Sequence, residues 1–574
     1  MSLIDLASLV LAPTATKEGK VYSAIPDTGE GDMTFTRGSA ATRVNSAGLI
    51  EKERGNLLLQ SNSFDTTWSS VLTANVVGGQ SGYDGSSDAW TLETQSGQAS
   101  RRAQNLSGLE SVNSFSVYAK ANTLDWMRLQ ISTASGNYVG DFDLTNGVSG
   151  YNFGDPLPSI ESVGNGWYRV KISGFNVPTQ VRIYALSGNN DFSGAGTIFI
   201  QDAMLNQGLV AQSYIETTTT AVYEGITDDV PRVDYSGGGC PSLKLEPQRS
   251  NLAVHSEYFE ASNWTALRST IALSSSTSPE GVLNAYKLTT DNTTNNTHII
   301  YYGGTLSTDD YALSVYAKAG EFSKVGLGTG NLTLSAKFDL SNGSIITSGT
   351  HTASIEDAGN GWYRCSIVTT TTTPIRIVLL DDDGNISFDG DGTSGLYIYG
   401  HQCEAGSYST SYLPTYGTST TRVQDSCYKT GISSLLNPSE GAVFLEINTF
   451  DNGTTSKVFT IGDGTGNRIQ VFYYEDSIRL NFTSGGTSYA YFNHALTDVN
   501  DTIKMAVSYA NNDIRMYVNG VLTNSDTSAT MPSTLSYARF DNGSGGSLFY
   551  GNIKQSLIFP TALTNDELAE LTKL

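Results

Sequence analysis

The hexapeptide "GNGWYR" occurs twice in this chain, at Gly164–Arg169 and again at Gly359–Arg364. Its Gly-Asn-Gly part supplies the positive-φ positions that tight turns require. Its Trp-Tyr-Arg part opens a run in which two sets of side chains alternate, as in a strand with one buried and one wetted face. The hexapeptide therefore predicts a turn followed by a strand, in two copies.

The repeat extends well beyond these six residues. "FSVYAKA" at Phe115–Ala121 matches "LSVYAKA" at Leu313–Ala319, and "FDLTNG" at Phe142–Gly147 matches "FDLSNG" at Phe338–Gly343. The separation between the two copies stays nearly constant from one string to the next. Such long-period self-similarity indicates two homologous modules.

Each module contains many short strand patterns separated by Gly, Asn, Asp and Ser clusters, and helical patterns are almost absent. Frequent turns between short strands are typical of a two-sheet antiparallel sandwich. We predict tandem jelly-roll β-sandwiches at residues 56–222 (module one) and 251–421 (module two). Trp167 and Trp362 then have two interpretations. We favour an anchor buried between the sheets, and the alternative is a platform for a sugar ring.

Similar short segments precede each part of the chain. "ATRV" ends at Val44, "VPRV" at Val233 and "TTRV" at Val423. Related connectors predict a stiff row of domains, and we place two of them at residues 223–250 and 422–438. Residues 1–55 lack the character of the repeat, so we expect a short extended segment there that attaches the chain to a larger assembly.

Residues 439–574 are not a third copy of the repeat. They show strand patterns joined by turns, including the Asn519–Gly520 hairpin signal in "YVNGVL". A short helix is expected at the end, because Thr564 can cap it with Glu567 three residues on. The sequence thus predicts an all-β fold of three sandwiches.

Composition narrows the function. The chain has 33 basic and 56 acidic residues, a net charge of −23. Such a surface repels phosphate backbones and anionic lipid, so we expect neither nucleic acid nor a membrane as partner. No apolar run is long enough for a membrane helix, and the N-terminus lacks a basic region typical of signal peptides. A polar surface with only 16% charged residues suits neutral ligands such as sugars, or subunit contacts.

No catalytic motif is present. The five histidines are isolated, the four cysteines have no close spacing, and the motifs of serine hydrolases and of phosphate-binding loops are absent. We therefore predict that the protein is not an enzyme. A glycosidase, whose paired carboxylates only the fold can bring together, stays the alternative.

One acidic stretch has metal-ligand character. In "DDDGNISFDGDG", Asp381, Asp383 and Asn385 alternate as oxygen ligands of Ca²⁺ do, although the full EF-hand spacing is missing. The other interpretation is a solvated hairpin loop, because Asp, Asn and Gly are ordinary turn formers. A structural Ca²⁺ in module two is the one cofactor that the sequence suggests.

Sugar binding requires exposed aromatic rings beside amide or carboxylate groups. Six aromatic residues outside the repeated core strings are candidates: Trp90, Trp126, Tyr301, Tyr302, Tyr489 and Tyr491. Because side chains two residues apart on a strand point the same way, we expect Tyr489 and Tyr491 to share a face. A place in the core or in a subunit contact is the alternative for each of the six.

Two resemblances follow from these strings. "IRMYVNG" and "GNIKQSLIFPTALTNDELAEL" resemble concanavalin A-like or laminin G-like domains, curved sandwiches that often bind glycans or proteins. "SVYAKA", "GNGWYR" and "GDGTSGLYIYGHQCEAGSYSTSYLPT" resemble the carbohydrate-binding-module-like jelly rolls of tailed-bacteriophage surface proteins, and "FTRGSAATRVNSAGLIE" resembles phage structural proteins. Module two has Glu404 where module one has Asn206, so the two modules need not share a ligand.

The resemblances imply a virion protein. We expect a fibre-type adhesin that meets other phage structural proteins of the head or tail through its N-terminus, binds host surface glycans and forms a homotrimer. Weak single sites would then gain strength from copy number. A capsid-decorating or head-fibre protein with a mainly structural role is the alternative, and a glycan depolymerase is the third hypothesis.

Overall fold

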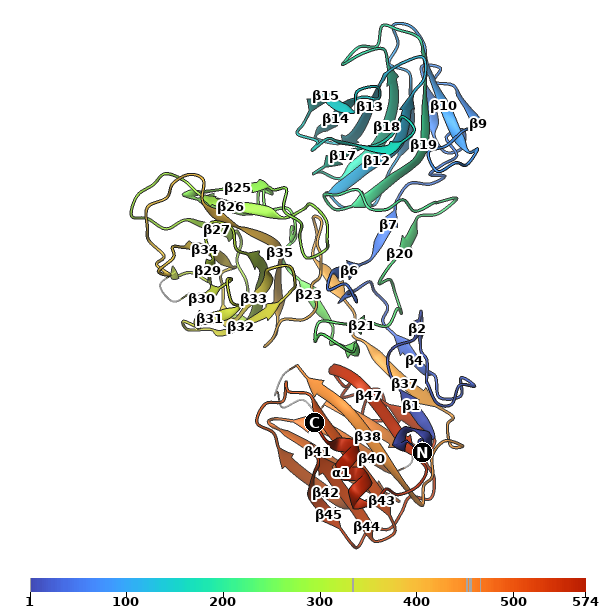
Figure 1. The fold of residues 1–574 in the computed structure, drawn as a ribbon, viewed down its shortest axis with the longest axis vertical. Coiled ribbons are helices and arrows are strands. Elements are labelled where there is room, and N and C mark those ends of the chain that lie inside the picture. Colours follow the sequence, from blue (N-terminus) through green and yellow to red (C-terminus); the bar gives the residue numbers. More distant parts are fainter. Residues whose placement is uncertain (1, 333–334, 451–452, 454–456, 465) are drawn as a thin grey trace.

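The computed structural model describes residues 2–332, 335–450, 453, 457–464 and 466–574. Nearly all elements are strands, and they form three lobes around a central junction (Figure 1). The all-β prediction is confirmed. Among the described residues, no helix combines the length and apolar character needed to cross a membrane.

Module one is a jelly roll of two six-stranded antiparallel sheets. The first sheet has the order β16 (Ser159–Gly164), β17 (Trp167–Gly174), β12 (Asn113–Ala121), β19 (Gly196–Gln207), β10 (Ala89–Thr94) and β9 (Val76–Gln80). The second has the order β15 (Val148–Phe153), β14 (Gly136–Asp143), β13 (Trp126–Thr133), β18 (Pro178–Leu186), β11 (Arg101–Asn105) and β8 (Ser69–Val71). From β10 to β13, consecutive strands alternate between the two sheets, as in a jelly roll.

Module two repeats this topology strand for strand. One sheet has the order β25 (Ser269–Leu273), β26 (Tyr286–Thr290), β35 (Gly395–Ala405), β28 (Asp309–Lys318), β33 (Trp362–Thr371) and β32 (Thr352–Asp357). The other has the order β24 (Trp264–Leu267), β27 (Ile299–Tyr302), β34 (Arg376–Leu380), β29 (Lys324–Gly328), β30 (Ala336–Asp339) and β31 (Ser344–Thr347). The predicted tandem jelly rolls are thus present.

The repeated hexapeptide forms the turn and strand that its sequence predicts. Asn165 and Asn360 both adopt a φ of 53°, and each is followed by the tryptophan that opens β17 or β33. Both rings are buried, but they lie on the outer face of their sheet, on the side opposite Val170 and Ile172 of the module-one core. The interpretation as an anchor between the sheets is therefore corrected: other segments cover the rings from outside.

The C-terminal sandwich, the lower lobe of Figure 1, consists of a nine-stranded and an eight-stranded sheet. The larger has the order β2 (Thr16–Lys17), β3 (Lys20–Val21), β4 (Met33–Thr36), β37 (Ser426–Thr430), β46 (Tyr537–Arg539), β39 (Lys457–Gly462), β40 (Arg468–Tyr474), β41 (Ser477–Ser484) and β42 (Thr487–Ala495). The smaller has the order β21 (Val233–Asp234), β22 (Ser242–Leu245), β47 (Gly551–Phe559), β38 (Glu440–Thr449), β43 (Ile503–Ala510), β44 (Asp513–Val518) and β45 (Val521–Asp526), and β1 (Leu9–Leu11) also pairs with β47.

Two local predictions for this sandwich are confirmed. The helix α1 (Asn565–Thr572) begins at Thr564, whose Oγ1 accepts a hydrogen bond from the Glu567 backbone N–H at 3.3 Å. The Asn519–Gly520 turn joins β44 to β45 with both residues at positive φ. Each is a local signal, fixed by residues close together in the chain.

The N-terminal segment differs from the extended attachment segment expected for residues 1–55. After a short 3₁₀ turn, η1 (Leu3–Leu6), strand β1 pairs with β47, and β4 pairs with β37. The side chains of Leu9 and Leu11 lie in the core of the C-terminal sandwich. The segment is ordered because it covers strand edges that would otherwise expose unpaired backbone groups.

The remaining connectors form short two-stranded pairs at the junction. They are β5 (Thr42–Val44) with β6 (Ile50–Lys52), β7 (Arg54–Asn56) with β20 (Val222–Glu224), and β23 (Arg249–Asn251) with β36 (Thr420–Arg422). The β5–β6 hairpin packs on the outer face of module two. There Ile50 joins a buried cluster that includes Trp362 and Tyr399, and Trp362 Nε1 donates to the Thr277 carbonyl of module two at 2.9 Å. The hairpin and module two's own loop thus contribute to the burial of the second repeated tryptophan.

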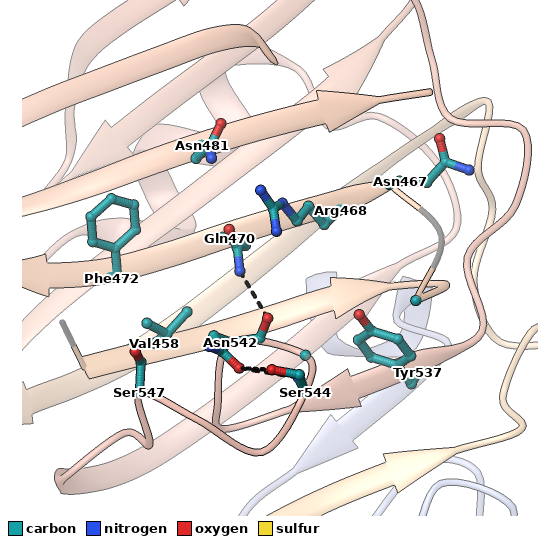
Figure 2. A pocket seen from close by; sticks show the side chains of 13 residues that line it. Val458, Asn467, Arg468, Gln470, Phe472, Asn481, Tyr537, Asn542, Ser544 and Ser547 are labelled. Carbon is teal, nitrogen blue, oxygen red and sulfur yellow. Dashed lines mark hydrogen bonds between the residues drawn. The ribbon is translucent and has the colours of Figure 1, made fainter. Parts of the chain in front are cut away.

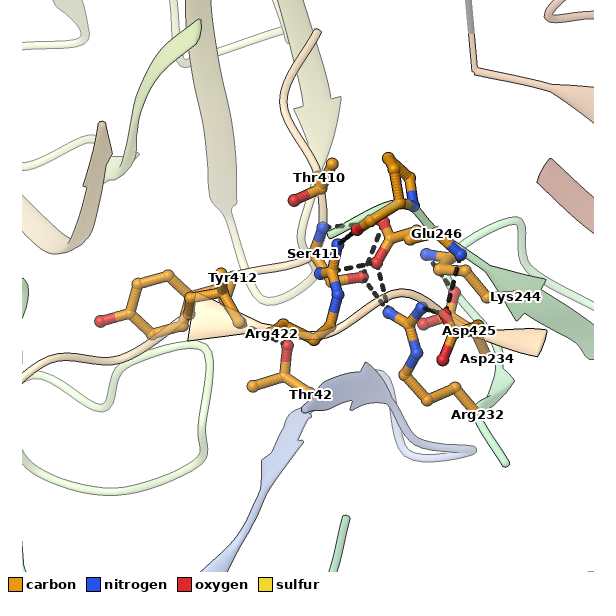
Figure 3. A network of polar contacts seen from close by, with 12 residues as sticks. Thr42, Arg232, Asp234, Lys244, Glu246, Thr410, Ser411, Tyr412, Arg422 and Asp425 are labelled. Carbon is orange, nitrogen blue, oxygen red and sulfur yellow. Dashed lines mark hydrogen bonds and ion pairs between the residues drawn. The ribbon is translucent and has the colours of Figure 1, made fainter. Parts of the chain in front are cut away.

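At the centre of the junction the connectors meet in a buried ionic cluster, the junction knot, formed by Arg37, Arg232, Glu246, Arg422 and Asp425. Figure 3 labels Arg232, Glu246, Arg422 and Asp425 of this cluster. Arg232 pairs with both acids, Arg422 Nη1 lies 2.8 Å from Glu246 Oε2, and Arg37 Nη1 lies 3.3 Å from Asp425 Oδ1. Burial alone would raise the pKa of Glu246, but the two neighbouring guanidinium groups hold it well below its ordinary range. Removing one partner of such a network leaves an uncompensated buried charge.

Candidate functional site

A cavity of about 410 Å³ opens on the outer face of the nine-stranded sheet (Figure 2). Strands β39, β40 and β41 form its floor, and the loop of residues 541–548 forms one wall. Strand alternation creates the floor, because Ile469 and Val471 point into the core while Arg468, Gln470 and Phe472 point outward.

The floor carries hydrogen-bonding groups that are held in place or left open. Gln470 Nε2 donates to Thr460 Oγ1 at 3.3 Å and to the Asn542 carbonyl at 3.2 Å. On the next strand, Asn481 Oδ1 accepts from Ser488 Oγ at 2.9 Å. The Arg468 guanidinium forms no hydrogen bond or ion pair within the described parts of the chain, so its donors are available to a ligand.

The wall loop is rigid because its own acidic and amide groups hold it. Asp541 is fully buried, with its Oδ2 2.8 Å from Arg539 Nη2 and its Oδ1 accepting from the Gly543 N–H at 2.6 Å. Asn542 Oδ1 accepts from the backbone N–H of Ser544 at 3.1 Å and from its hydroxyl at 2.8 Å. A loop fixed in this way does not have to be ordered when a ligand binds.

The opposite end of the cavity is equally well supported. Asn467 Nδ2 donates to Asp463 Oδ2 at 2.6 Å, and Asn467 Oδ1 accepts from the Gly485 N–H at 2.8 Å. Burial raises the pKa of Tyr537, so its hydroxyl stays protonated. A Cβ on Gly543 would lie 2.5 Å from that hydroxyl, and its φ is +93°, so this position requires glycine.

An exposed aromatic residue extends the floor. Tyr491 on β42 is 56% exposed, and its ring centroid lies 6.3 Å from that of Phe472 in the cavity. Arg479 Nη1 donates to the Tyr491 hydroxyl at 3.2 Å and so fixes the ring. Of the six candidate aromatic residues, Tyr491 is the one that the structure places beside this cavity.

Tyr489 does not share a face with Tyr491, contrary to the expectation from their spacing. The β41–β42 register shifts between Phe482 and Thr483, opposite Tyr489, and the Tyr489 ring packs against the sandwich core. A β-bulge adds a residue to one strand and so reverses the alternation beyond it.

The four candidates in the modules are covered to different degrees. Tyr302 is a core residue, 9% exposed, and its hydroxyl accepts from the Val254 N–H at 2.9 Å. Tyr301 is half-buried on the other face of the same strand, beneath the guanidinium of Arg376 at 5.7 Å. Neither ring is presented as a free platform.

Trp90 and Trp126 are each covered by a glycine of a nearby strand. A Cβ on Gly78 would lie 3.2 Å from the Trp90 ring, and one on Gly150 would lie 2.5 Å from the Trp126 ring. Trp90 also donates through Nε1 to the Asn62 carbonyl at 2.8 Å. The backbone approaches both rings closely, which leaves one ring face packed in each case.

The Ca²⁺ candidates form a turn. Asp381 Oδ1 accepts from the backbone N–H of Asp383 at 3.1 Å and of Asn385 at 2.7 Å. Lys324 donates to the Asp382 carbonyl, and Lys337 Nζ donates to the Gly384 carbonyl at 2.7 Å. The described residues contain no group of three or more His, Cys, Asp or Glu side chains placed to hold a metal ion. The Asp381 carboxylate thus holds the hairpin turn, and a Ca²⁺ bound by Asp381, Asp383 and Asn385 stays a prediction.

Glu404 of module two and Asn206 of module one, which occupy matching positions, each form hydrogen bonds within their own module. Glu404 Oε1 accepts from the Thr410 N–H at 2.7 Å, while Asn206 Nδ2 donates to the Val210 carbonyl at 2.9 Å and its Oδ1 accepts from the Gln212 N–H at 3.2 Å. Both side chains are buried and tie the strand end to the loop that follows it.

Comparison with known proteins places the cavity in a recognised domain type. Residues 425–569 match the family described as the concanavalin A-like lectin/glucanases superfamily. The predicted concanavalin A-like domain is thus confirmed, and the match begins at β37, inside the segment that we had assigned to a connector. No curated protein matches the chain.

Among solved structures, the chain is similar to the Ruminococcus gnavus IT-sialidase CBM40 bound to α2,3-sialyllactose, with 14% identity and a TM-score of 0.22 over 24% of this chain and 84% of that one. It is similar to domain 4 of AbnA, a GH43 extracellular arabinanase from Geobacillus stearothermophilus, in complex with arabinotriose, with 17% identity and a TM-score of 0.22 over 26% and 73%. NanB sialidase from Streptococcus pneumoniae has 16% identity and a TM-score of 0.23 over 25% and 26%.

Most residues that line this cavity could not be predicted from the positions of aromatic residues alone. Arg468, Gln470, Phe472 and Asn481 carry no motif. The available signal is the alternation in "RIQVFYY", where Arg, Gln and Phe occupy the face opposite Ile and Val. A polar set that alternates with core residues on a middle strand indicates an exposed sheet face, but not that a loop walls it.

Proposed function

We propose that this protein is a non-catalytic carbohydrate-binding protein and that the cavity of its C-terminal sandwich binds an acidic glycan. The observation that carries the proposal is the unpaired guanidinium of Arg468. It lies among amide, hydroxyl and aromatic groups in a cavity where, among the described lining residues, no side chain is acidic. The chain as a whole has a charge of −23, so the positive charge of this cavity is opposite in sign to the net charge of the protein.

Each group of the cavity has a counterpart in a sugar acid. Asn467, Asn481 and Gln470 offer the donors and acceptors that ring hydroxyls require. Phe472 and the neighbouring Tyr491 offer apolar faces for the C–H side of a sugar ring. A guanidinium binds a carboxylate with two parallel hydrogen bonds, which supports an acidic rather than a neutral glycan.

The same lining favours binding over hydrolysis. Glycosidases use a pair of carboxylic side chains on either side of the scissile bond. The described residues that line the cavity include neither Asp nor Glu, and Asp541 behind the wall is fully buried and paired with Arg539.

At the level of the whole particle, we propose a surface adhesin of a tailed-bacteriophage virion that forms a homotrimer and binds host glycans. The sequence resemblances support this proposal, and copy number would multiply a weak single site. Because residues 9–36 lie in the C-terminal sandwich, attachment to other virion proteins would use a folded surface rather than a free N-terminal segment.

A capsid-decorating or head-fibre role is the second candidate. It is favoured by the junction knot, which joins the connectors between all three sandwiches through buried ion pairs. Such a body can serve as a rigid spacer without any glycan. The two candidates differ in whether the loss of one cavity side chain changes attachment to host cells.

The test is an array of oligosaccharides, with and without carboxylate groups, probed with the full chain. We expect binding to be confined to the carboxylate-bearing members. Replacement of Arg468 by Ala should weaken it about tenfold, since a charge-assisted hydrogen bond contributes about 1.5–3 kcal/mol. The control is Lys554→Ala, which removes one positive charge from the other sheet of the same sandwich.

Three results would contradict the proposal. Equal binding of neutral and acidic members, or unchanged binding by Arg468→Ala, would remove the role of the guanidinium. Absence of binding to every member, together with normal attachment of the particle, would favour the structural candidate. Release of shorter saccharides from a host polysaccharide would indicate a depolymerase.

A further inference from the structure

A second cavity, of about 440 Å³, lies at the junction of the two modules. Its walls come from four separate parts of the chain: the β5–β6 hairpin and β7, the exit of module one at residues 207–213, Glu224 and Gly225 at the end of β20, and module two at Glu257 and residues 280–284. It shares no lining residue with the cavity of the C-terminal sandwich.

The walls are held together by direct contacts between the modules. Phe175 of module one stacks on Tyr258 of module two, with ring centroids 4.4 Å apart and planes 13° from parallel. Ser111 donates through its backbone N–H and its Oγ to the Tyr416 carbonyl, at 2.9 and 2.8 Å. The cavity is therefore a feature of one packed interface and not a gap between independent domains.

Three hydrogen-bond acceptors on its walls are buried and unused. Gln212 Oε1, Glu257 Oε2 and Asn284 Oδ1 are buried atoms with no hydrogen-bond partner in the described chain. Glu257 and Asn284 are each only 2% exposed. A buried acceptor without a partner costs about 1–3 kcal/mol, so three of them on one cavity indicate a ligand that supplies donors.

The charged side chains that line the cavity indicate whether the ligand is positively or negatively charged. Four carboxylates and two cations line the cavity. Lys52 Nζ lies 2.9 Å from Glu257 Oε1 and also pairs with Glu280. Arg54 pairs with Glu224, with Nη2 2.9 Å from Oε2. The acidic excess disfavours an anion and favours a group that brings positive charge together with N–H donors.

We propose that this interdomain cavity is a second binding site, for a small polar ligand that carries a primary ammonium group and several hydroxyl groups, as an amino sugar does. The ammonium is a pure donor, and the buried atoms of the lining that lack a partner in the described chain are all acceptors. The hydroxyl groups match Asn45 and Gln207, the other amide side chains of the lining. This site is independent of the acidic-glycan site and of opposite charge preference.

A ligand here would contact both modules and the hairpin at once. Since it would bind the packed arrangement and not the separated one, it would stabilise the interface by mass action. Binding and a rise in the melting temperature of the two modules should therefore occur together.

The test uses the full chain and two probes, D-glucosamine and its neutral counterpart N-acetyl-D-glucosamine, with affinity measured by saturation-transfer difference NMR. We expect D-glucosamine to bind saturably and N-acetyl-D-glucosamine to bind much more weakly. Gln212→Leu should weaken D-glucosamine about tenfold, because an acceptor for a charged donor is lost. The Gln212 side chain makes no hydrogen bond of its own in the described chain, and only its backbone groups do, so the variant keeps the fold.

A matched control separates the loss of the cavity amide from a general effect of the substitution. Gln98→Leu changes an exposed glutamine of module one and should bind D-glucosamine as the wild type does. Glu257→Gln is a second variant within the cavity and should also weaken D-glucosamine. The proposal is overturned if neither probe saturates, if both probes bind equally, or if Gln212→Leu and Glu257→Gln both keep the wild-type affinity.

Discussion

At the residue level, one ammonium group at the module junction serves two carboxylates. Lys52 pairs with Glu257 and with Glu280, and all three side chains are nearly or fully buried. Burial, together with the charge of Glu280, raises the pKa of Glu257 to about 7, although Lys52 opposes this shift. Below about pH 7 the folded protein thus holds a proton on Glu257 that the unfolded chain, with an ordinary glutamate pKa of 4.5, has released, and above this pH the Glu257 carboxylate can accept from a ligand.

A pH-dependent stability follows with a defined sign. Between pH 4.5 and about 7 the folded state binds more protons at Glu257 than the unfolded state does, so the free energy of unfolding falls as pH rises through this window. Glu257→Gln cannot titrate and should remove this part of the fall. Denaturant unfolding at pH values on either side of the window measures it, and an identical pH slope in wild type and variant would contradict the assignment.

Residue identities in the sequence predicted some roles and not others. The exposure of Tyr491 follows from its strand position, but the burial of Tyr489 depends on a bulge that no local pattern announces. The alternation in "WYRVKIS" already placed Trp167 on the same face as Arg169 and Lys171. Its burial there comes from neighbours on other segments: the ring centroids of Tyr83 and Phe199 lie 6.3 and 6.4 Å from that of Trp167.

Arg468 illustrates a different limit. A single charged residue on a strand is ordinary in sequence, and its significance comes from the loop of residues 541–548 that walls the cavity. That loop and β40 are brought together only by the sheet order, in which β46 lies beside β39. Side chains that are brought together by long-range strand pairing share no local sequence motif, so their proximity cannot be predicted from the sequence.

At the level of elements, the short strand β1 contributes to the core of the C-terminal sandwich. Its three residues pair with β47, and Leu11 is 1% exposed in the core of the C-terminal sandwich. Period-two patterning predicted strands such as β12 and β17 correctly. The partner of β1 could not be predicted, because neighbouring strands in a sheet are usually close in sequence and Leu9 pairs opposite Ile558.

Leu11→Ala should therefore destabilise the sandwich at the far end of the chain. Truncating a buried leucine costs about 2–5 kcal/mol. All six tryptophans lie between residues 68 and 362, so tryptophan fluorescence reports the modules, and near-UV tyrosine circular dichroism includes the sandwich. We expect the tyrosine transition to move to lower denaturant with little change in the fluorescence transition.

Leu6→Ala is the matched control for this prediction. Leu6 precedes β1 in the 3₁₀ turn and is 37% exposed, so the same truncation there should change the free energy of unfolding only slightly. Equal effects of the two variants, or no effect of Leu11→Ala, would show that β1 does not contribute to the sandwich core.

At the level of the whole molecule, the domain boundaries of the sequence and of the fold do not coincide. The C-terminal sandwich takes β1 to β4 from the N-terminal segment and β21 and β22 from the connector between the modules. Leu243, Leu245 and Phe35 all belong to its core. Composition and repeats predicted the number and class of the sandwiches. They could not predict that strands of the N-terminal segment pair with strands of the C-terminal sandwich, because this pairing forms only in the tertiary structure.

A fragment of residues 425–574 should for this reason fail to fold as a domain. It would lack six strands of the sandwich and expose the edges of β37 and β47, which favours aggregation. We expect the purified fragment to show no cooperative unfolding transition, while the full chain shows one for the sandwich. A soluble fragment with a sharp transition and native near-UV signal would contradict this expectation.

The pairing of Leu9 with Ile558 also sets the order of events during synthesis. The first strands leave the ribosome long before their partners exist, on the order of half a minute to two minutes earlier at about 5–20 residues per second. Both modules can close during translation, but β1 stays unpaired, with its apolar residues exposed, until β47 has left the ribosome. A chaperone that shields this segment would raise the yield of intact protein. Premature termination would leave two folded modules preceded by an unpaired apolar segment that favours aggregation.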